Sequence, residues 1–204
     1  MLSPTIIFDL GNAILTNDYP CHTGDQVKEF CDYFNVSFDN SMRGWETSWP
    51  EFRIGEISED DFWKKFLTYS LTDKIDIDFA KKFWTENQKP KENMLKLLQS
   101  LKKNYRLAAL TTISKDWLEY KRKRFNLDSY FELIVSSGYS GFVKPDKRAY
   151  DLVLKELSED PANCLFIDDL ERNLPPAKKL GMKTILFSTQ ENLEKELRAL
   201  GIKF

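Results

Sequence analysis

The sequence predicts an α/β fold in three α/β/α layers, with a small helical cap inserted after the first strand. Short, continuous runs of apolar residues recur along the chain, and segments with helical spacing separate them. Such runs are typical of parallel strands that helices bury on both faces of a sheet. An aromatic-rich helical stretch interrupts this alternation after the first run and predicts the insertion.

Five apolar runs are predicted to be the strands of a parallel sheet. Each run ends at polar or turn-forming residues, and Gly11 and Asn12 favour a turn after the first one. The predicted strands are residues 5–8, 107–110, 133–135, 165–167 and 184–187.

Five other segments are predicted to be helices of the core. Ser114 favours a helix start, while Gly181 and Gly201 favour helix ends. The predicted helices are residues 92–103, 114–125, 146–157, 170–180 and 190–200.

Residues from about 16 to 90 contain many aromatic side chains with helical spacing and few strand signals. Aromatic residues in this pattern usually pack together, so we expect them to form the core of the insertion rather than a base-stacking platform. The predicted domains are a core of residues 1–15 and 91–204 and a helical cap of residues 16–90.

The composition is that of a soluble globular protein, with 204 residues, 42% hydrophobic, 30% charged and a formal net charge of −2. This near-balance argues against a nucleic-acid or membrane partner held by long-range charge. Cys21, Cys31 and Cys164 show no CxxC spacing and predict free thiols in a reducing compartment. The N-terminus has neither a basic segment nor a long apolar one, so we expect a cytoplasmic protein.

Polar residues follow the predicted strands, where the carboxyl ends of a parallel sheet form a ligand crevice. Asp9, Thr111 and the pair Asp168-Asp169 follow three of the runs, and Lys144 lies one loop beyond another. Carboxylates from separate strands can share Mg²⁺, which needs only one or two of them when a phosphate supplies a further ligand. A lysine can neutralise crowded carboxylates, and threonine and backbone N–H groups can bind phosphate oxygens. The pattern predicts a magnesium-dependent phosphate site.

Each of these residues also has a purely structural interpretation. An aspartate at a strand end often forms a turn or caps a helix, and a lysine before Pro145 is often a solvated loop residue. Asp168, Asp169 and Glu171 fit the acidic first turn of a helix, which the helix dipole favours. Their shared placement after strand-like runs favours a common site instead.

Four motifs occur in one order along essentially the whole chain. They are IIFDLGN at residues 6–12, LTT at 110–112, GYSGFVKPD at 138–146 and LFIDDLERN at 165–173. In this order the motifs resemble those of the haloacid dehalogenase (HAD) superfamily of hydrolases, in the branch with a helical cap after the first motif. The resemblance implies a Rossmann-like core and a small phosphate ester as the substrate.

The resemblance also implies roles for individual side chains. Asp9 would attack phosphorus and form an aspartyl-phosphate intermediate, and Lys144 and Thr111 would complete the catalytic set. Thr111, Thr112, Asn12 and Lys144 would bind the substrate.

A magnesium site is implied in the same way. Asp9 and Asp168 would bind the metal, with Asp169 as a second ligand or as a partner just outside the ligand shell. The backbone carbonyl of Gly11 would also coordinate it, and a carbonyl needs no particular side chain.

The first motif departs from the family pattern at Gly11. Phosphatases of this family usually carry a second aspartate there as the general acid and base, a form of catalysis that contributes about 10²–10⁴-fold. Glycine cannot transfer a proton and Asn12 cannot act as a base, so Asp18 and His22 are candidate replacements. Some members similar to this chain share the sequence Asp-Leu-Gly-Asn and resemble sugar-phosphate phosphatases.

Three functions fit these residues. The first is a phosphatase for a small phosphorylated metabolite, with a sugar phosphate as one candidate. The second is a 2-haloacid dehalogenase, which also lacks the second aspartate and whose lysine–tyrosine spacing Lys144 and Tyr150 match. The enzymes of that branch are similar to one another in having no metal at the active site. In this chain, Asp168 and Asp169 would repel a carboxylate substrate. The third is a non-catalytic phosphate-binding or regulatory protein, which Gly11 supports.

Substrate selection is expected to come from the cap. Trp45, Trp49, Arg53 and Tyr19 are candidate contacts there. Arg53 could hold a second anionic group, and a solvated helix arginine is the competing interpretation. The sequence leaves the oligomeric state open.

Overall fold

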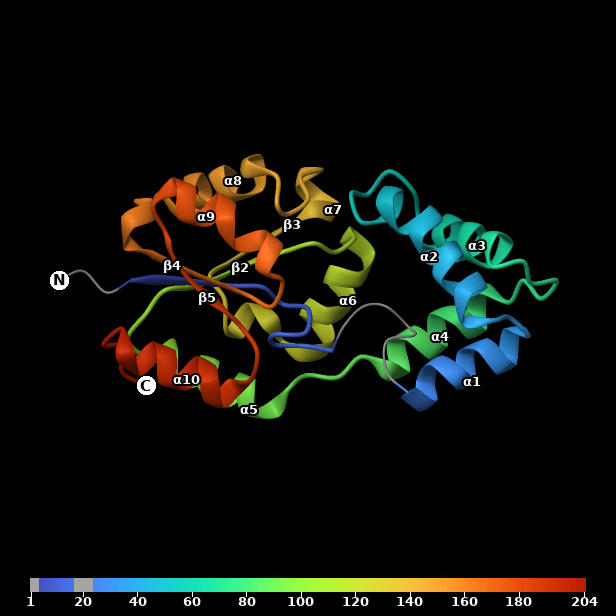
Figure 1. Ribbon diagram of the computed structural model, residues 1–204, viewed down its shortest axis with the longest axis horizontal. Coiled ribbons are helices and arrows are strands. Elements are labelled where there is room, and N and C mark those ends of the chain that lie inside the picture. The colour runs from blue at the N-terminus through green and yellow to red at the C-terminus, as the bar shows by residue number, and fades with distance from the viewer. Residues whose placement is uncertain (1–3, 17–23) are drawn as a thin grey trace.

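The structure is a computed structural model of the 204-residue chain and describes residues 4–16 and 24–204 (Figure 1). The strands are β1 (Thr5–Phe8), β2 (Leu107–Thr111), β3 (Leu133–Ser136), β4 (Cys164–Asp168) and β5 (Lys183–Leu186). The helices that follow β1 directly are α1 (Gly24–Phe34), α2 (Phe38–Phe52), α3 (Glu59–Tyr69) and α4 (Ile77–Asn87), together called the four-helix unit. The remaining α-helices are α5 (Glu92–Leu101), α6 (Lys115–Phe125), α7 (Ser137–Ser140), α8 (Lys147–Leu157), α9 (Leu174–Leu180) and α10 (Gln190–Ala199).

The five strands form one parallel sheet in the order β3-β2-β1-β4-β5. β1 is the central strand, and Ile6 is in register with Leu107 of β2 and Leu165 of β4. The carboxyl ends of β1, β2 and β4 are therefore neighbours, although they come from distant parts of the sequence. This sheet confirms the parallel α/β fold predicted from the apolar runs.

Helices cover both faces of the sheet, as the three-layer prediction requires. Ile6 and Phe8 of β1 pack in one hydrophobic cluster with residues of α5, α6 and α10. Ile7 points to the other face and packs with residues of α8 and α9. In Figure 1, α8 and α9 accordingly lie on one side of the strands, and α5 and α10 lie on the other.

One predicted helix differs from the structure. The segment 170–180 forms a 3-10 turn, η3 (Glu171–Asn173), and α9 then begins only at Leu174. Pro175 and Pro176 explain the late start, because proline lacks an N–H and is tolerated only in the first turn of a helix. The other four predicted core helices begin and end within about two residues of their expected bounds.

Aromatic side chains fill the interior of the four-helix unit, as expected. Gly44 lets α2 approach α3, because a Cβ at that position would lie 2.5 Å from the carbonyl oxygen of Phe66. The buried aromatic residues of the unit are Phe30, Phe34, Phe52, Phe62, Trp63, Phe66, Phe83 and Trp84. They form one continuous cluster with Trp117 of α6 and with one face of the sheet.

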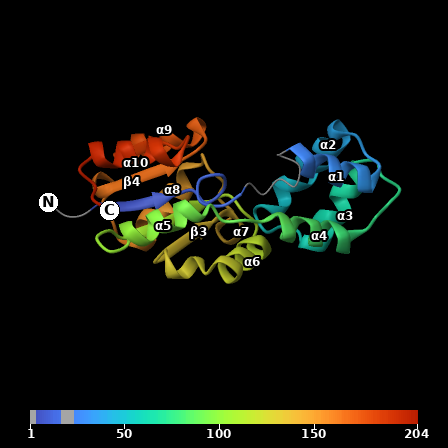
Figure 2. The same cartoon turned by 90° about the horizontal axis from the view of Figure 1, so that it is seen from below.

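Two adjacent connections join the four-helix unit to the core. The Thr16 N–H donates to the Lys89 carbonyl, and the Lys91 N–H donates to the Ile14 carbonyl, each over 2.9 Å. Figure 2 shows the unit beyond one end of the sheet, and Figure 1 places the start of β1 and the C-terminus at the opposite end. The division into domains at residues 16 and 90 stays a prediction.

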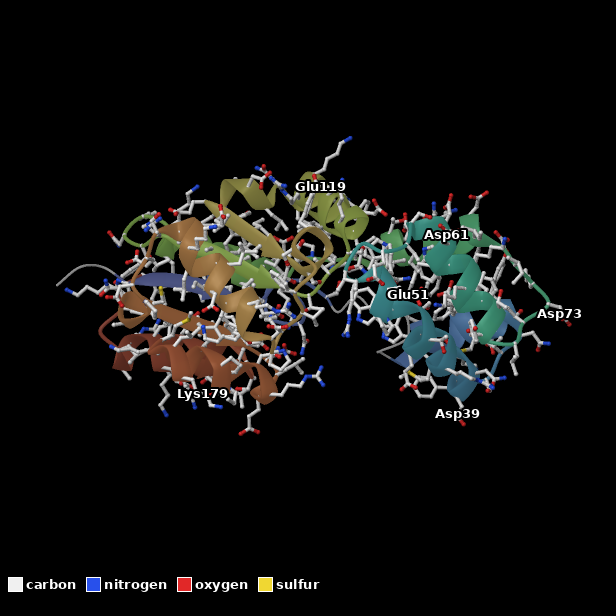
Figure 3. The ribbon with its side chains drawn as sticks, turned by 90° about the horizontal axis from the view of Figure 1, so that it is seen from above. Asp39, Glu51, Asp61, Asp73, Glu119 and Lys179 are labelled. Carbon is white, nitrogen blue, oxygen red and sulfur yellow. The ribbon has the colours of Figure 1, made fainter. Side chains whose placement is uncertain are left out.

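Charged side chains lie on the outside of the four-helix unit and of the core. Examples are Asp39 and Asp73 on the four-helix unit and Lys179 on α9 (Figure 3). In residues 4–16 and 24–204, no helix combines the length and the apolar character needed to cross a membrane. Cys31 and Cys164 are buried free thiols, and burial raises the pKa of Cys164 to about 12. Cys21 lies outside the described residues.

Candidate active site

A cavity of about 460 Å³ lies where the carboxyl ends of β1, β2 and β4 meet α2 of the four-helix unit. Its size suits a small metabolite, because ligand cavities typically measure about 300–1,000 Å³. The residues that line it are Asp9, Gly11, Asn12, Trp45, Trp49, Arg53, Thr111, Thr112, Val143, Lys144, Asp169, Leu170, Arg172 and Asn173.

Lys144 joins two aspartates beside this cavity. Its Nζ lies 2.6 Å from Asp9 Oδ1 and 2.6 Å from Asp168 Oδ2. All three side chains are buried, and Asp168 is fully inaccessible. A buried carboxylate is stable only when it is paired and hydrogen-bonded, so the shared lysine is what allows both acids to sit here.

Further hydrogen bonds fix Asp168 behind Lys144. The Asn173 Nδ2 donates to both of its carboxylate oxygens, over 2.9 and 3.0 Å, and the Leu170 N–H donates to Oδ1 over 2.8 Å. Asn173 is itself placed by its backbone, whose carbonyl accepts a 2.6 Å hydrogen bond from Tyr150. Asp168 is thus held by donors on three sides and does not line the cavity.

Asp169 faces the cavity and has a different set of partners. The Asn12 Nδ2 donates to Asp169 Oδ2 over 2.9 Å. Asn12 adopts a left-handed conformation with φ of 52°, which asparagine tolerates better than most residues. The Lys91 ammonium donates to the Asn12 carbonyl and therefore ties this turn to the connection with the four-helix unit.

The electrostatics of the three aspartates fit a divalent cation. One oxygen from each of Asp9, Asp168 and Asp169 lies within 4.8 Å of the other two. Burial raises the pKa of Asp9 to about 7, with Lys144 lowering it and the charge of Asp168 raising it. Three carboxylates with a single lysine leave an excess of negative charge, and oxygen donors are the ligands that Mg²⁺ prefers.

Thr111 and Thr112 form the part of the cavity at the end of β2. Thr111 is the last residue of that strand and is buried. Ser114 caps α6, as predicted, by accepting a hydrogen bond from the Trp117 N–H over 3.3 Å. The Ile113 N–H donates to Ser137 Oγ over 3.0 Å, which holds the intervening loop in place. Thr111 and Thr112 therefore line the cavity from the end of a strand and from a loop that is held in place.

The cavity collects most of the residues that the motifs indicate. Asp9, Gly11, Asn12, Thr111, Thr112, Lys144 and Asp169 all line it, and Asp168 lies behind Lys144. Trp45, Trp49 and Arg53 line it as well, whereas Tyr19 and the candidate acid–base groups Asp18 and His22 lie outside the described residues.

Two residues at this site, Arg172 and Lys91, were not expected from sequence. Arg172 lies within the fourth motif, but its neighbours there read as the first turn of a helix, so nothing marked it as a cavity residue. Lys91 has no sequence signal, because its partner Asn12 is 79 positions away along the chain.

Comparison with known proteins places this site in a family. The family model of haloacid dehalogenase-like hydrolases matches residues 5–181. The drimenol cyclase drtB of Aspergillus calidoustus is 24% identical over 196 residues, which cover 94% of this chain but only 35% of that protein. The flavin mononucleotide hydrolase 1 of Arabidopsis thaliana is 26% identical over 204 residues, which cover 98% of this chain and 78% of the relative.

A solved structure shows the same fold. An HAD family enzyme from Bacteroides thetaiotaomicron, in complex with magnesium and inorganic phosphate, matches with a TM-score of 0.77 and 19% identity. The match covers 93% of this chain and 98% of that one. The family model spans most of the chain and all four motifs, and so this protein belongs to the haloacid dehalogenase-like hydrolases.

Proposed function

We propose that this hydrolase is a magnesium-dependent phosphatase for a small phosphorylated metabolite, acting through an aspartyl-phosphate on Asp9. The observation that carries the proposal is the placement of Asp9 in the cavity, paired with Lys144 and within reach of Asp169. The flavin mononucleotide hydrolase among the relatives and the magnesium–phosphate complex of the structural neighbour support the same chemistry.

Mg²⁺ would be held by Asp9, Asp169 and the Gly11 carbonyl, the oxygen donors on the cavity side of the cluster. When bound, it would stabilise negative charge on the phosphoryl group. Asp168 completes the acidic cluster from behind. Four hydrogen bonds already reach the two carboxylate oxygens of Asp168. We therefore assign to Asp168 the role of orienting Lys144 rather than the main contact with the metal.

Asp9 is the nucleophile, and Lys144 orients it for the attack. The lysine holds Oδ1, which leaves Oδ2, the oxygen nearest Gly11, to form the bond to phosphorus while the ester oxygen leaves. Hydrolysis of the resulting acyl phosphate by water then restores the carboxylate. Thr111 and Thr112 would hold the phosphoryl oxygens from the end of β2, where donors stabilise the developing charge.

Gly11 determines which esters can be cleaved quickly. It supplies no proton to the leaving oxygen, so an ester with an acidic leaving group, such as an aryl phosphate, should react faster than an alkyl phosphate. The presence of glycine at position 11 also favours a second candidate function, that of a protein that binds phosphate without turnover.

The test is phosphate release from para-nitrophenyl phosphate and a panel of sugar phosphates, with Mg²⁺ or with chelator. Asp9→Asn is the inactivating variant, and Asp39→Asn, an exposed aspartate of α2, is the matched control. Release that needs Mg²⁺ and disappears only in Asp9→Asn supports the phosphatase. No release from any ester, together with Mg²⁺-dependent binding of a metal-fluoride phosphate mimic, would establish the binding protein instead.

A further inference from the structure

A second cluster of positive charge lines the same cavity, apart from Lys144. Arg53 follows the end of α2, and Arg172 lies in η3 after β4, so the four-helix unit and the core contribute one arginine each. The Arg53 carbonyl accepts a 2.6 Å hydrogen bond from Ser137 Oγ, which fixes its backbone against the core. The two guanidinium groups are therefore brought to one cavity by tertiary structure.

Neither arginine has an acidic partner among the residues the structure describes. No carboxylate oxygen of those residues lies within 4.0 Å of either guanidinium group. The Nε of Arg53 is buried, and no described residue supplies an acceptor for it. Burial lowers the pKa of Arg53, and the positive charge of Arg172 lowers it further. A buried donor beside a second cation, without an acceptor, is costly unless an anion occupies the site.

The metal site does not need these charges. Three negative carboxylates are balanced by Lys144 and a divalent cation, so the cluster is neutral before any substrate binds. The charges of Arg53 and Arg172 are consequently in excess and are available to the ligand.

The helix that ends just before Arg53 also presents two indole rings to the cavity. Trp45, Trp49 and Arg53 follow one another at intervals of four residues and so share a face of α2. The two indole rings stack, with centroids 4.6 Å apart. This face offers an apolar surface that ends in a guanidinium group.

We propose that Arg53 and Arg172 form a subsite for a second anionic group of the substrate. The proposal rests on the phosphatase function above and narrows its substrate class. The substrate is a phosphate ester that also carries a carboxylate or another phosphate, and its body packs against Trp45 and Trp49. The transferred phosphoryl group lies at Asp9 and the second anion lies between the arginines.

The competing role for these arginines is to bind the transferred phosphoryl group itself. Matched substrate pairs separate the two roles: phenyl phosphate with para-carboxyphenyl phosphate, and a hexose monophosphate with the corresponding bisphosphate. A second-anion subsite makes kcat/KM about tenfold or more higher for the doubly anionic member of a pair, because a charge-assisted hydrogen bond discriminates by that factor.

The variants are Arg53→Met and Arg172→Met, with Arg53→Lys retaining the charge. Arg43→Met, an exposed arginine earlier on α2 and outside the cavity, is the matched control. We expect each methionine variant to reduce the preference within a pair toward unity, Arg53→Lys to retain part of it, and Arg43→Met to retain all of it. Wild-type protein without preference in either pair, or equal losses for both members in the methionine variants, would overturn the subsite.

A binding measurement separates failure of this subsite from failure of the phosphatase function. In Asp9→Asn protein, quenching of tryptophan fluorescence reports binding of each pair without turnover, because Trp45 and Trp49 line the cavity. A preference in Kd that Arg53→Met abolishes, without turnover in the wild type, would support the subsite and refute the phosphatase. Turnover by the wild type without any such preference would support the phosphatase and refute the subsite.

Discussion

Lys144 Nζ lies 2.6 Å from Asp9 Oδ1, and this pair is buried at the carboxyl end of the central strand. The same ammonium group is 2.6 Å from Asp168, so one cation serves two buried acids. Removing one member of a buried ion pair costs far more than removing an exposed one, because the remaining charge keeps its desolvation penalty. We therefore expect the proposed activity and the folding stability to depend on the same side chain.

Lys144→Met should abolish phosphate release and destabilise the protein. Without Mg²⁺ at neutral pH, we expect the free energy of unfolding to fall by about 3–5 kcal/mol, since two buried carboxylates lose their cation. Urea denaturation measures the loss. Lys147→Met is the control, because this exposed lysine pairs with the exposed Asp151 on α8, and its loss should cost less than about 0.5 kcal/mol. Similar losses in the two variants would contradict a buried role for Lys144.

Gly11→Asp should accelerate hydrolysis of alkyl phosphates. A Cβ at this position would lie 3.6 Å from Asp9 Oδ2, an ordinary contact, so the backbone at Gly11 accepts a side chain beside the nucleophile. A carboxyl group there could protonate the leaving oxygen and raise kcat by as much as about 10²-fold. Initial rates on alkyl and aryl phosphates measure the gain, which should be smaller for the aryl ester. Gly11→Ala adds a Cβ without a carboxyl group and so tests the effect of side-chain volume. An equal gain in this variant would refute the acid–base explanation.

Most of the core could be predicted from sequence because its signals are local. The run at residues 5–8 is apolar at every position, and in the structure these residues form a central strand whose four side chains are all buried. Asp9 and Asp169 were predictable cavity residues for a related reason, since Asp9 directly follows such a run and Asp169 lies two positions beyond another. The late start of α9 was missed, although Pro175 and Pro176 marked it, because the acidic residues before them resemble a helix start.

Contacts between distant segments could not be predicted in this way. From sequence, Arg53 was a candidate contact for a second anionic group, with a solvated helix arginine as the competing interpretation. The packing of the four-helix unit against Ser137 and the core brings it to the cavity. The contact of Lys91 with Asn12 likewise depends on the paired connections at residues 14–16 and 89–91. Neither contact leaves a periodic or compositional trace in the sequence.

Lys91→Met should weaken Mg²⁺ binding. The lysine donates to the carbonyl of Asn12, and the side-chain amide of Asn12 donates to Asp169, so its loss frees the proposed metal ligand to move. Loss of such outer partners typically reduces metal affinity by about 10–100-fold, and we expect a value near tenfold. Calorimetric titration with Mg²⁺ gives the affinity directly. Lys89→Met, an exposed lysine of the same connection, should retain wild-type affinity, and Lys91→Arg should recover part of it. An unchanged Mg²⁺ affinity in Lys91→Met would show that this lysine does not support the metal site.

Glu159 should make folding stability depend on pH below neutrality. Burial raises the pKa of this carboxyl, but hydrogen bonds led by that from Thr5, with the charge of Arg106, outweigh it and hold the pKa below its ordinary value. Thr5 Oγ1 and Arg106 Nη1 donate to Glu159 Oε2 over 2.9 and 2.8 Å. A lowered folded-state pKa means that the group stabilises the protein above its unfolded pKa of about 4.5 and loses this effect as the pH falls through the folded value.

Glu159→Gln tests this dependence. At pH 7 the variant should lose about 1 kcal/mol of unfolding free energy, because a neutral amide accepts weaker hydrogen bonds from Thr5 and Arg106. As the pH is lowered from 7 through the folded-state pKa, the wild-type carboxyl becomes protonated, and the difference between the two proteins should shrink. Thermal melts of both proteins across this range measure the difference, with Glu156→Gln on the exposed side of α8 as the control. A loss that stays constant with pH would mean that Glu159 acts through packing rather than through its charge.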